Sequence, residues 1–149
     1  MMELPKSSEE MKERIAELME RSCTKHSDAM AARLKPEIVS ANLEEQSVVL
    51  AFTAQHWQRN FAGMMHGGII AAILDTSIGY ICYSMVGGPP LTASLSTNYL
   101  RPGPISGKVH VVVKLDKLGK KLLFGNAKMY IPSTPGKFIA TANATYIIV

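Results

Sequence analysis

The sequence has little cysteine and no obvious export signal. Its two cysteines, Cys23 and Cys82, lie far apart and form no C-x-x-C pair, which argues against a disulfide framework. The N-terminus carries alternating charges and lacks the apolar stretch of a secretory signal. His26, His56 and His110 show no metal-ligand spacing. We therefore expect reduced thiols, a cytoplasmic location and no bound metal.

Charge is sparse and has no strong bias. Charged residues make up 19% of the chain, and the formal net charge is +4. The sequence contains no long basic run and no basic stretch interleaved with aromatic residues, the pattern that single-stranded nucleic-acid binders use. We expect no nucleic-acid partner. A mildly basic surface also suits a phosphorylated small molecule.

The length and composition are typical of one globular domain. The chain has 149 residues, of which 47% are hydrophobic, and it shows no internal repeat. That length allows a sizeable core. We expect a helical extension over residues 1–35 and a main domain over residues 36–149.

One apolar stretch dominates the sequence. The segment from Gly67 to Val86 is long enough for about five helical turns, and it is apolar on nearly every face, as in a helix buried on all sides. It also has the length of a membrane span. However, Asp75 near its midpoint would cost about 2.5 to 3.5 kcal/mol on insertion. We therefore expect a core helix and no membrane contact, with Asp75 needing a specific reason to be there.

The flanking segments predict an α+β fold. A capping box at Ser7 and Glu10 precedes an amphipathic helix, and a short helical turn is expected over residues 28–34. Short runs rich in Val and Leu then predict six strands, over residues 38–43, 47–53, 91–100, 107–116, 121–131 and 138–148. The short turns between the last four favour an antiparallel meander. The economical arrangement is a sheet of about six strands wrapped around the apolar helix.

The start of the apolar helix has the features of an acyl-transfer site. A helix N-terminus presents free N–H groups that stabilise an oxyanion, and Gly67 and Gly68 have no side chain to block a ligand. Asp75 would supply a nucleophile or a general base. Along one helix Gly67 and Asp75 are separated by about 12 Å. A joint site therefore requires Gly67 of one subunit and Asp75 of another, as a two-fold homodimer with two equivalent sites allows.

A longer pattern resembles a known family. The spacing Asn60-x-x-Gly63-x-x-His66-Gly67-Gly68, followed by Asp75, resembles the acyl-coenzyme A thioesterases of the hotdog fold, in particular the PaaI-like branch. The strand over residues 92–99, the Leu-Arg-Pro-Gly segment at 100–103 and the last strand also fit. The resemblance covers roughly residues 37 to 149.

The resemblance implies specific catalytic roles. Gly67 would polarise the thioester carbonyl through its backbone N–H, and Asp75 would be the catalytic carboxylate. Asn60 and His66 would orient the thioester or the water, and Thr92 would help to hold that water.

Two further positions qualify these roles. Ser94, one pleat along from Thr92, is an alternative hydroxyl. Some relatives carry a hydroxyl one helical turn after the carboxylate, where this chain has Gly79, so that contribution is absent. An aspartate in place of a glutamate places the chain with the Asp-using branch.

The substrate contacts are less defined. The resemblance implies that basic residues bind the coenzyme A phosphates, although a solvated hairpin tip explains most of them equally well; the candidates are Arg101, Lys117, Lys120 and Lys121. The acyl group could contact apolar loop residues that otherwise pack in the fold, namely Trp57, Phe61, Met64 and Met65. Cys82 fits a small buried core residue better than a nucleophile.

The expected protein is a hotdog homodimer, or a dimer of such dimers, that hydrolyses an acyl-coenzyme A thioester to free acid and thiol. Coenzyme A enters as part of the substrate, so no separate cofactor is expected. A non-catalytic acyl-coenzyme A binder is the alternative. The sequence does not identify the acyl group.

Overall fold

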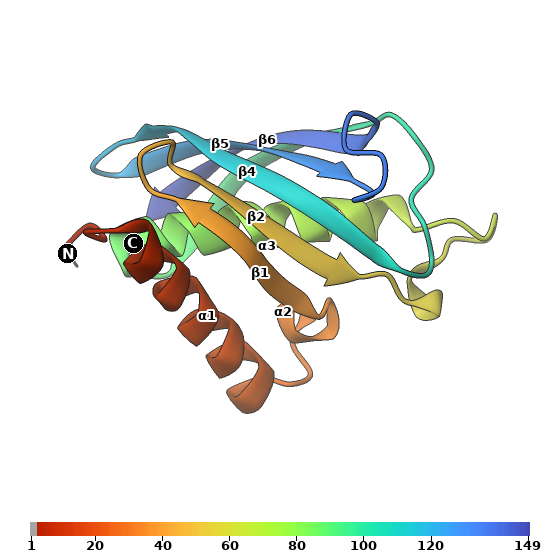
Figure 1. Cartoon of the computed structure of the whole chain (residues 1–149), viewed down its shortest axis with the longest axis horizontal. Coiled ribbons are helices and arrows are strands. Elements are labelled where there is room, and N and C mark those ends of the chain that lie inside the picture. The colour runs from red at the N-terminus through yellow and green to blue at the C-terminus, as the bar shows by residue number, and fades with distance from the viewer. Residues whose placement is uncertain (1–2) are drawn as a thin grey trace.

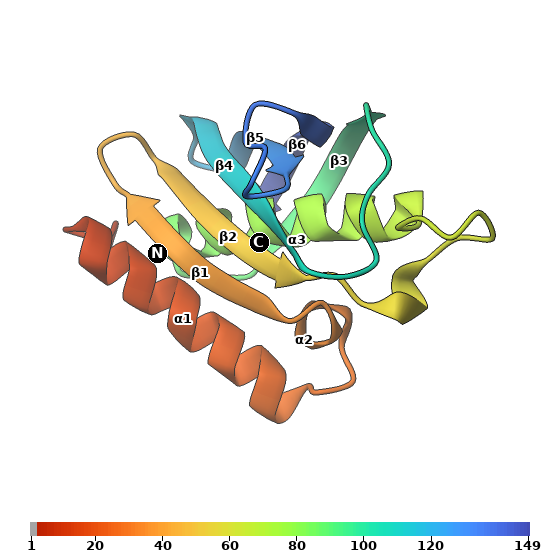
Figure 2. The same cartoon turned by 45° about the vertical axis from the view of Figure 1, so that its right-hand side comes forward.

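The computed structural model, which describes residues 3–149, confirms the expected architecture of one sheet around one helix. The elements follow in the order α1 (Ser8–Lys25), α2 (Met30–Arg33), β1 (Pro36–Asn42), β2 (Ser47–Thr53), η1 (His56–Gln58), α3 (Gly67–Val86), β3 (Pro90–Tyr99), β4 (Lys108–Leu118), β5 (Leu122–Tyr130) and β6 (Phe138–Ile148). The antiparallel sheet curves around α3 (Figure 1, Figure 2).

The strand order differs from a simple meander. The sheet runs β1-β2-β4-β5-β6-β3, so β3 pairs with β6 and lies three strands away from β4. The expected four-strand meander is therefore wrong for β3. The segment over residues 100–107 was expected to be a tight turn, yet it crosses about 14 Å of sheet at a strand spacing near 4.8 Å. Eight residues can easily span that distance.

The strands take their register from alternating burial. On β4 the inward positions are Val109, Val111, Val113 and Leu115, all at most 3% exposed, and the positions between them face outward. This is the two-residue period of a half-buried strand. The inward side chains pack on Ile73, Ile78 and their neighbours along α3.

The N-terminal helix belongs to the same core. Met11, Ile15 and Met19 of α1 are buried in it, and α1 lies beside β1 (Figure 2). The Ser7 side chain caps α1 by accepting from the Glu10 N–H at 3.1 Å, whereas the Glu10 carboxylate accepts from the Lys6 N–H. Half of the expected capping box therefore forms. Nothing in this packing separates residues 3–35 as an independent unit.

Helix α3 is less enclosed than its sequence suggests. In the part of the chain that the structure describes, it is the one helix long and apolar enough to span a membrane, and 61% of its most apolar window is buried in the fold. One stripe remains partly open, a correction to the expectation of burial on all sides. Its members are small or polar residues one turn apart: Gly68, Ala72, Asp75, Thr76, Gly79 and Tyr83.

Candidate functional site

Asp75 lies halfway along α3 and is held by two hydroxyl groups from the sheet. The Tyr146 hydroxyl donates to Asp75 Oδ1 at 2.6 Å, and it lies 2.5 Å from the main-chain oxygen of the same residue. The Thr92 hydroxyl donates to the same Oδ1 at 2.9 Å. Among residues 3–149, no hydrogen bond reaches Oδ2. The carboxylate is half-buried, so its charge keeps some contact with solvent.

The pairing of β3 with β6 explains why these two hydroxyls meet. Thr92 is opposite Tyr146 in the antiparallel register, so both side chains point from the same face of the sheet toward α3. Tyr146 is 2% exposed. Burial, and then the hydrogen bond to Asp75, raises the pKa of the Tyr146 hydroxyl. Tyr146 therefore stays protonated and remains a donor at any physiological pH.

Ser94 does not belong to this cluster. The register shifts between Thr92 and Ser94, where a bulge lets Ser94 pair with Thr145 on the outer face of the sheet. There it lines a hollow of about 320 Å³ with Ser96, Asp116 and other polar residues. The expectation that Ser94 could take the place of Thr92 is therefore wrong, because the bulge places the two hydroxyls on opposite faces of the sheet.

The N-terminus of α3 forms the second half of the expected site. His66 is the N-cap, and its Nδ1 accepts from the Gly68 N–H at 2.8 Å. The His66 carbonyl accepts from the N–H groups of Ile69 and Ile70. In the described part of the chain, the Gly67 N–H is the one donor of this first turn without a protein partner. The observed hydrogen bond of His66 is therefore a helix cap.

Asn60 and Arg101 lie close to Gly67. They line one cavity of about 380 Å³ together with Tyr99 and Met65. Asn60 Oδ1 accepts from the N–H groups of Ala62 and Met64, so the side chain closes the loop before α3. The structure thus brings together Asn60, Gly67 and Arg101, which the sequence singled out for catalysis or phosphate binding.

Tyr99, which sequence reasoning missed, shapes the same cavity. Its hydroxyl donates to the Gly67 carbonyl at 2.9 Å. A Cβ placed on Gly67 would lie 3.4 Å from the Tyr99 ring, in ordinary van der Waals contact. Arg101 itself donates to the Phe138 carbonyl at 2.8 Å.

The basic hairpin lies at the other end of α3. Lys117, Lys120 and Lys121 surround the turn between β4 and β5, and Lys120 lines a hollow with Met85 and Val86 at the C-terminal end of α3. The structure therefore separates these lysines from Gly67 and Arg101 within one chain. Helical rise puts the two ends of the 20-residue helix about 30 Å apart.

The loop residues proposed to line an acyl pocket do not converge. Phe61 is fully exposed and belongs to the loop that projects from the body between η1 and α3 (Figure 1). Trp57 is half-exposed beneath the Arg33 guanidinium, whereas Met65 is buried. Met64 lines the Gly67 cavity with Met65.

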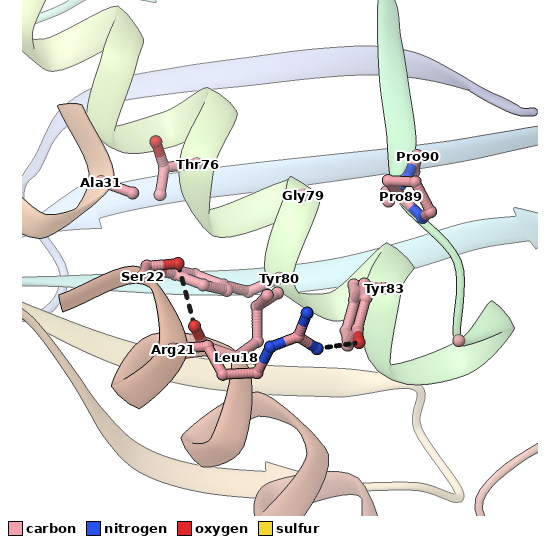
Figure 3. A pocket seen from close by; sticks show the side chains of 11 residues that line it. Leu18, Arg21, Ser22, Ala31, Thr76, Gly79, Tyr80, Tyr83, Pro89 and Pro90 are labelled. Atoms are coloured by element: carbon pink, nitrogen blue, oxygen red, sulfur yellow. Dashed lines mark hydrogen bonds between the residues drawn. The ribbon is translucent and has the colours of Figure 1, made fainter. Parts of the chain in front are cut away.

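A larger cavity of about 610 Å³ lies between α1 and the second half of α3, where sequence reasoning had placed nothing. Thr76, Gly79 and Tyr83 contribute one wall from the open stripe of α3, and α1 supplies the facing wall (Figure 3). Arg21 of α1 donates to the Tyr83 hydroxyl at 3.3 Å across it. Thr76, which follows Asp75 in the sequence, lines this cavity, whereas Asp75 itself does not.

Within residues 3–149 the structure shows neither a reactive cysteine near Asp75 nor a cluster of metal-binding side chains. Cys82 is completely buried, and burial raises the pKa of its thiol to about 12. A protonated thiol is a poor nucleophile. Within residues 3–149 no group of three or more His, Cys, Asp or Glu side chains is arranged to hold a metal ion.

Comparison with known families gives one consistent result. A family model described as the thioesterase superfamily matches residues 62–135, which include the start of α3 and Asp75. Acyl-coenzyme A thioesterase THEM4 of Bos taurus is 32% identical over 87 residues, covering 58% of this chain and 35% of that protein. Acyl-coenzyme A thioesterase 13 of Mus musculus is 27% identical, covering 74% of this chain and 78% of that protein.

The fold is also that of solved thioesterase-related structures. The Escherichia coli PaaI protein, from the phenylacetic acid degradation operon, superposes with a TM-score of 0.78 at 20% identity, covering 95% of both chains. This likeness shows the hotdog fold. The chain spans only about a third of the length of the bovine THEM4 relative.

Proposed function

Because this chain belongs to the thioesterase superfamily, we propose that it hydrolyses an acyl-coenzyme A thioester to a free acid and coenzyme A. The observation that carries the proposal is that two polar groups on α3 have no hydrogen-bond partner in the described part of the chain. The Gly67 N–H has no partner in the described chain, and Asp75 Oδ2 has none either. Two relatives named as acyl-coenzyme A thioesterases support the choice of substrate.

The reaction needs both groups at one carbonyl. The Gly67 N–H would donate to the thioester oxygen and stabilise the oxyanion. Asp75 would attack the carbonyl carbon, or would take a proton from an attacking water. The C–S bond then breaks, and the thiolate of coenzyme A leaves and takes up a proton. Attack by Asp75 gives a mixed anhydride of the acyl group and Asp75, which water then hydrolyses to the free acid and the carboxylate. In a single turnover in H₂¹⁸O, an acid free of ¹⁸O together with ¹⁸O in Asp75 would show this route, with water attacking the carboxyl carbon of Asp75.

We propose that the two groups come from different subunits. Within one chain the helical rise separates Gly67 from Asp75 by about 12 Å, too far for one carbonyl. A partner α3 running antiparallel along the open stripe would bring its Gly67 to the level of Asp75. Gly68 and Ala72, at the centre of such a crossing, are small and would let two helices approach closely.

Exposed apolar surface supports the same assembly. Strand β3 is an edge strand with one unpaired side, and Leu91, Tyr99 and Leu100 at its ends are more than half exposed. Phe61 is exposed at the loop tip. A homodimer would cover such surface, and a dimer of dimers is a further level that sedimentation would detect.

Mixed dimers test the shared site. An Asp75→Asn protomer combined with a Gly67→Pro protomer leaves one intact site in each mixed dimer and none in either parent. Random mixing should restore about a quarter of wild-type activity per protomer, since half of the dimers are mixed and half of their sites are intact. If both groups acted within one protomer, mixing would restore nothing.

The remaining residues would position the substrate. Asn60 and His66 lie beside the Gly67 donor, and Gly68 leaves the approach open. The acyl group would enter the cavity of Figure 3, next to Thr76 and Gly79. Basic residues at both ends of α3 would bind the coenzyme A phosphates, as their charge allows.

A panel of acyl-coenzyme A thioesters tests the function itself. Thiol release should be measured for aromatic, medium-chain and long-chain acyl groups, with Asp75→Asn as the inactive control. Turnover of at least one thioester supports the proposal. Tight binding without turnover would instead indicate an acyl-coenzyme A binding protein.

A further inference from the structure

The two oxygens of the Asp75 carboxylate are not equivalent. Oδ1 accepts hydrogen bonds from Tyr146 at 2.6 Å and Thr92 at 2.9 Å. Oδ2 accepts none from residues 3–149. We propose that Tyr146 is a positioning residue which, together with Thr92, occupies Oδ1 and leaves Oδ2 as the reacting oxygen. This inference rests on the proposed function.

Tyr146 is well anchored for that purpose. Its ring is 2% exposed and packs in the core, so the hydroxyl cannot swing away without opening a cavity. The same hydroxyl also lies 2.5 Å from the main-chain oxygen of Asp75. One donor therefore contacts both the side chain and the backbone of the catalytic residue, which restricts rotation of the carboxylate.

Tyr146 also brings a hydroxyl close to Gly79. Some relatives carry a hydroxyl one helical turn after the carboxylate, where this chain has Gly79. A Cβ built on Gly79 would lie 3.7 Å from the Tyr146 hydroxyl. The Tyr146 side chain thus reaches from β6 into the space beside Gly79 and brings a hydroxyl to that region.

The surroundings of Asp75 make these hydrogen bonds important. The groups that titrate beside it are Tyr146 on β6 and Cys82 further along α3, and both are buried with a raised pKa. Strand β3 contributes Thr92, which does not titrate. Hydroxyl donors are therefore the main stabilisation that this chain provides for the carboxylate.

Tyr146→Phe is the direct test, because it removes only the hydroxyl. We expect kcat to fall about 10- to 100-fold, the cost of a poorly oriented catalytic group, and KM to stay within about twofold. Tyr130→Phe is the matched control: Tyr130 lies in β5 on the outer face, and its kcat should be unchanged.

A second readout does not require turnover. The hydroxyl proton of Tyr146 should give a slowly exchanging, downfield NMR resonance, because it is buried and donates to a charged acceptor. The resonance should vanish in Tyr146→Phe, persist in Tyr130→Phe and move upfield in Asp75→Asn, where the acceptor is neutral. A resonance unaffected by Asp75→Asn would overturn the assignment.

Thr92→Val keeps the proposal testable if Tyr146→Phe fails to fold. It removes the second donor from a solvent-accessible strand position, and kcat should again fall with KM little changed. An unchanged kcat in a folded Tyr146→Phe variant would overturn this inference but not the proposed function. If only Thr92→Val folds, an unchanged kcat in that variant would do the same. Absence of hydrolysis by the wild-type protein would overturn the proposed function together with it.

Discussion

The two half-sites on α3 are built in different ways. At the N-terminus of the helix the unused group is a backbone N–H, surrounded by a loop that closes on Asn60 and a cap made by His66. Around Asp75 the polar groups are side chains that two strands deliver from distant parts of the sequence. The donor half depends on local backbone geometry, whereas the carboxylate half depends on the register of the sheet.

Of the substitutions that test the two half-sites, Asp75→Asn should lower activity the most. The amide keeps an oxygen that can accept from Tyr146 and Thr92, so the fold should persist, but the reacting charge is lost. We expect kcat to fall about 10²- to 10⁴-fold, measured by thiol release, with an unchanged thermal melting curve as the control. Retention of most activity would remove Asp75 from the mechanism.

Gly67→Pro tests the backbone half without adding a charge. Proline is favoured at the first helical position, and His66, at φ −62° and ψ 136°, already has the extended backbone that precedes proline. Loss of the N–H should lower kcat about 10²- to 10³-fold.

Gly67→Ala is the matched control. It keeps the N–H, and its Cβ would touch the Tyr99 ring at 3.4 Å without severe overlap. A Gly67→Pro variant as active as Gly67→Ala would show that another group stabilises the oxyanion.

Charge removal at each end of α3 should have moderate effects. Replacing Lys117, Lys120 and Lys121 by Ala should raise KM about three- to tenfold at low ionic strength, because exposed ion pairs are individually weak. Arg101→Gln, next to Gly67, should raise it less. The salt dependence of KM is the measurement. If removing the lysines leaves that dependence unchanged, the hairpin does not bind the phosphates.

Cysteine modification should have the smallest effect. Cys23 is exposed and Cys82 is buried, and burial raises the pKa of the Cys82 thiol to about 12. At pH 8 that thiol is protonated, so iodoacetamide should label Cys23 alone, as mass spectrometry would show. Activity should remain within about twofold of the untreated protein. Inactivation that follows labelling of Cys82 would contradict the carboxylate mechanism.

The comparison also explains what could be predicted of the site. The glycine pair and Asp75 are visible in the sequence because their roles follow from one helix and its N-terminus. Tyr146 was missed because an inward tyrosine in an apolar strand looks like an ordinary core residue. Its inward neighbours on β6, Ala142 and Ala144, are small and apolar. A polar hydroxyl among such neighbours was the sequence feature that could have indicated a role for Tyr146 in the site. Ser94 was predicted on the same face of the sheet as Thr92, because the alternation of inward and outward side chains does not reveal a β-bulge.

The fold was predictable to the level of its elements. The bounds of α3 follow from a continuous apolar run between two glycine pairs, and those of β2 from a run rich in Val and Leu after a polar turn. The sheet was expected around α3. The position of β3 was wrong because neighbours in sequence are usually neighbours in a sheet. Here β3 pairs with β6 at the edge, and the residues over 100–107 cross the end of the sheet. The pairing of β3 with β6 depends on packing around α3, and no short sequence pattern predicts that packing.

The pairing of β3 with β6 has a consequence for biosynthesis. Strand β3 has one partner within the chain, and that partner is made up of residues 138–148. During translation, β3 and the apolar surface of α3 beneath it must wait until those residues leave the ribosome. Contacts of such long sequence separation form slowly and leave the chain open to aggregation. Asp75 would acquire its hydrogen bond from Tyr146 only after β6 has joined the sheet.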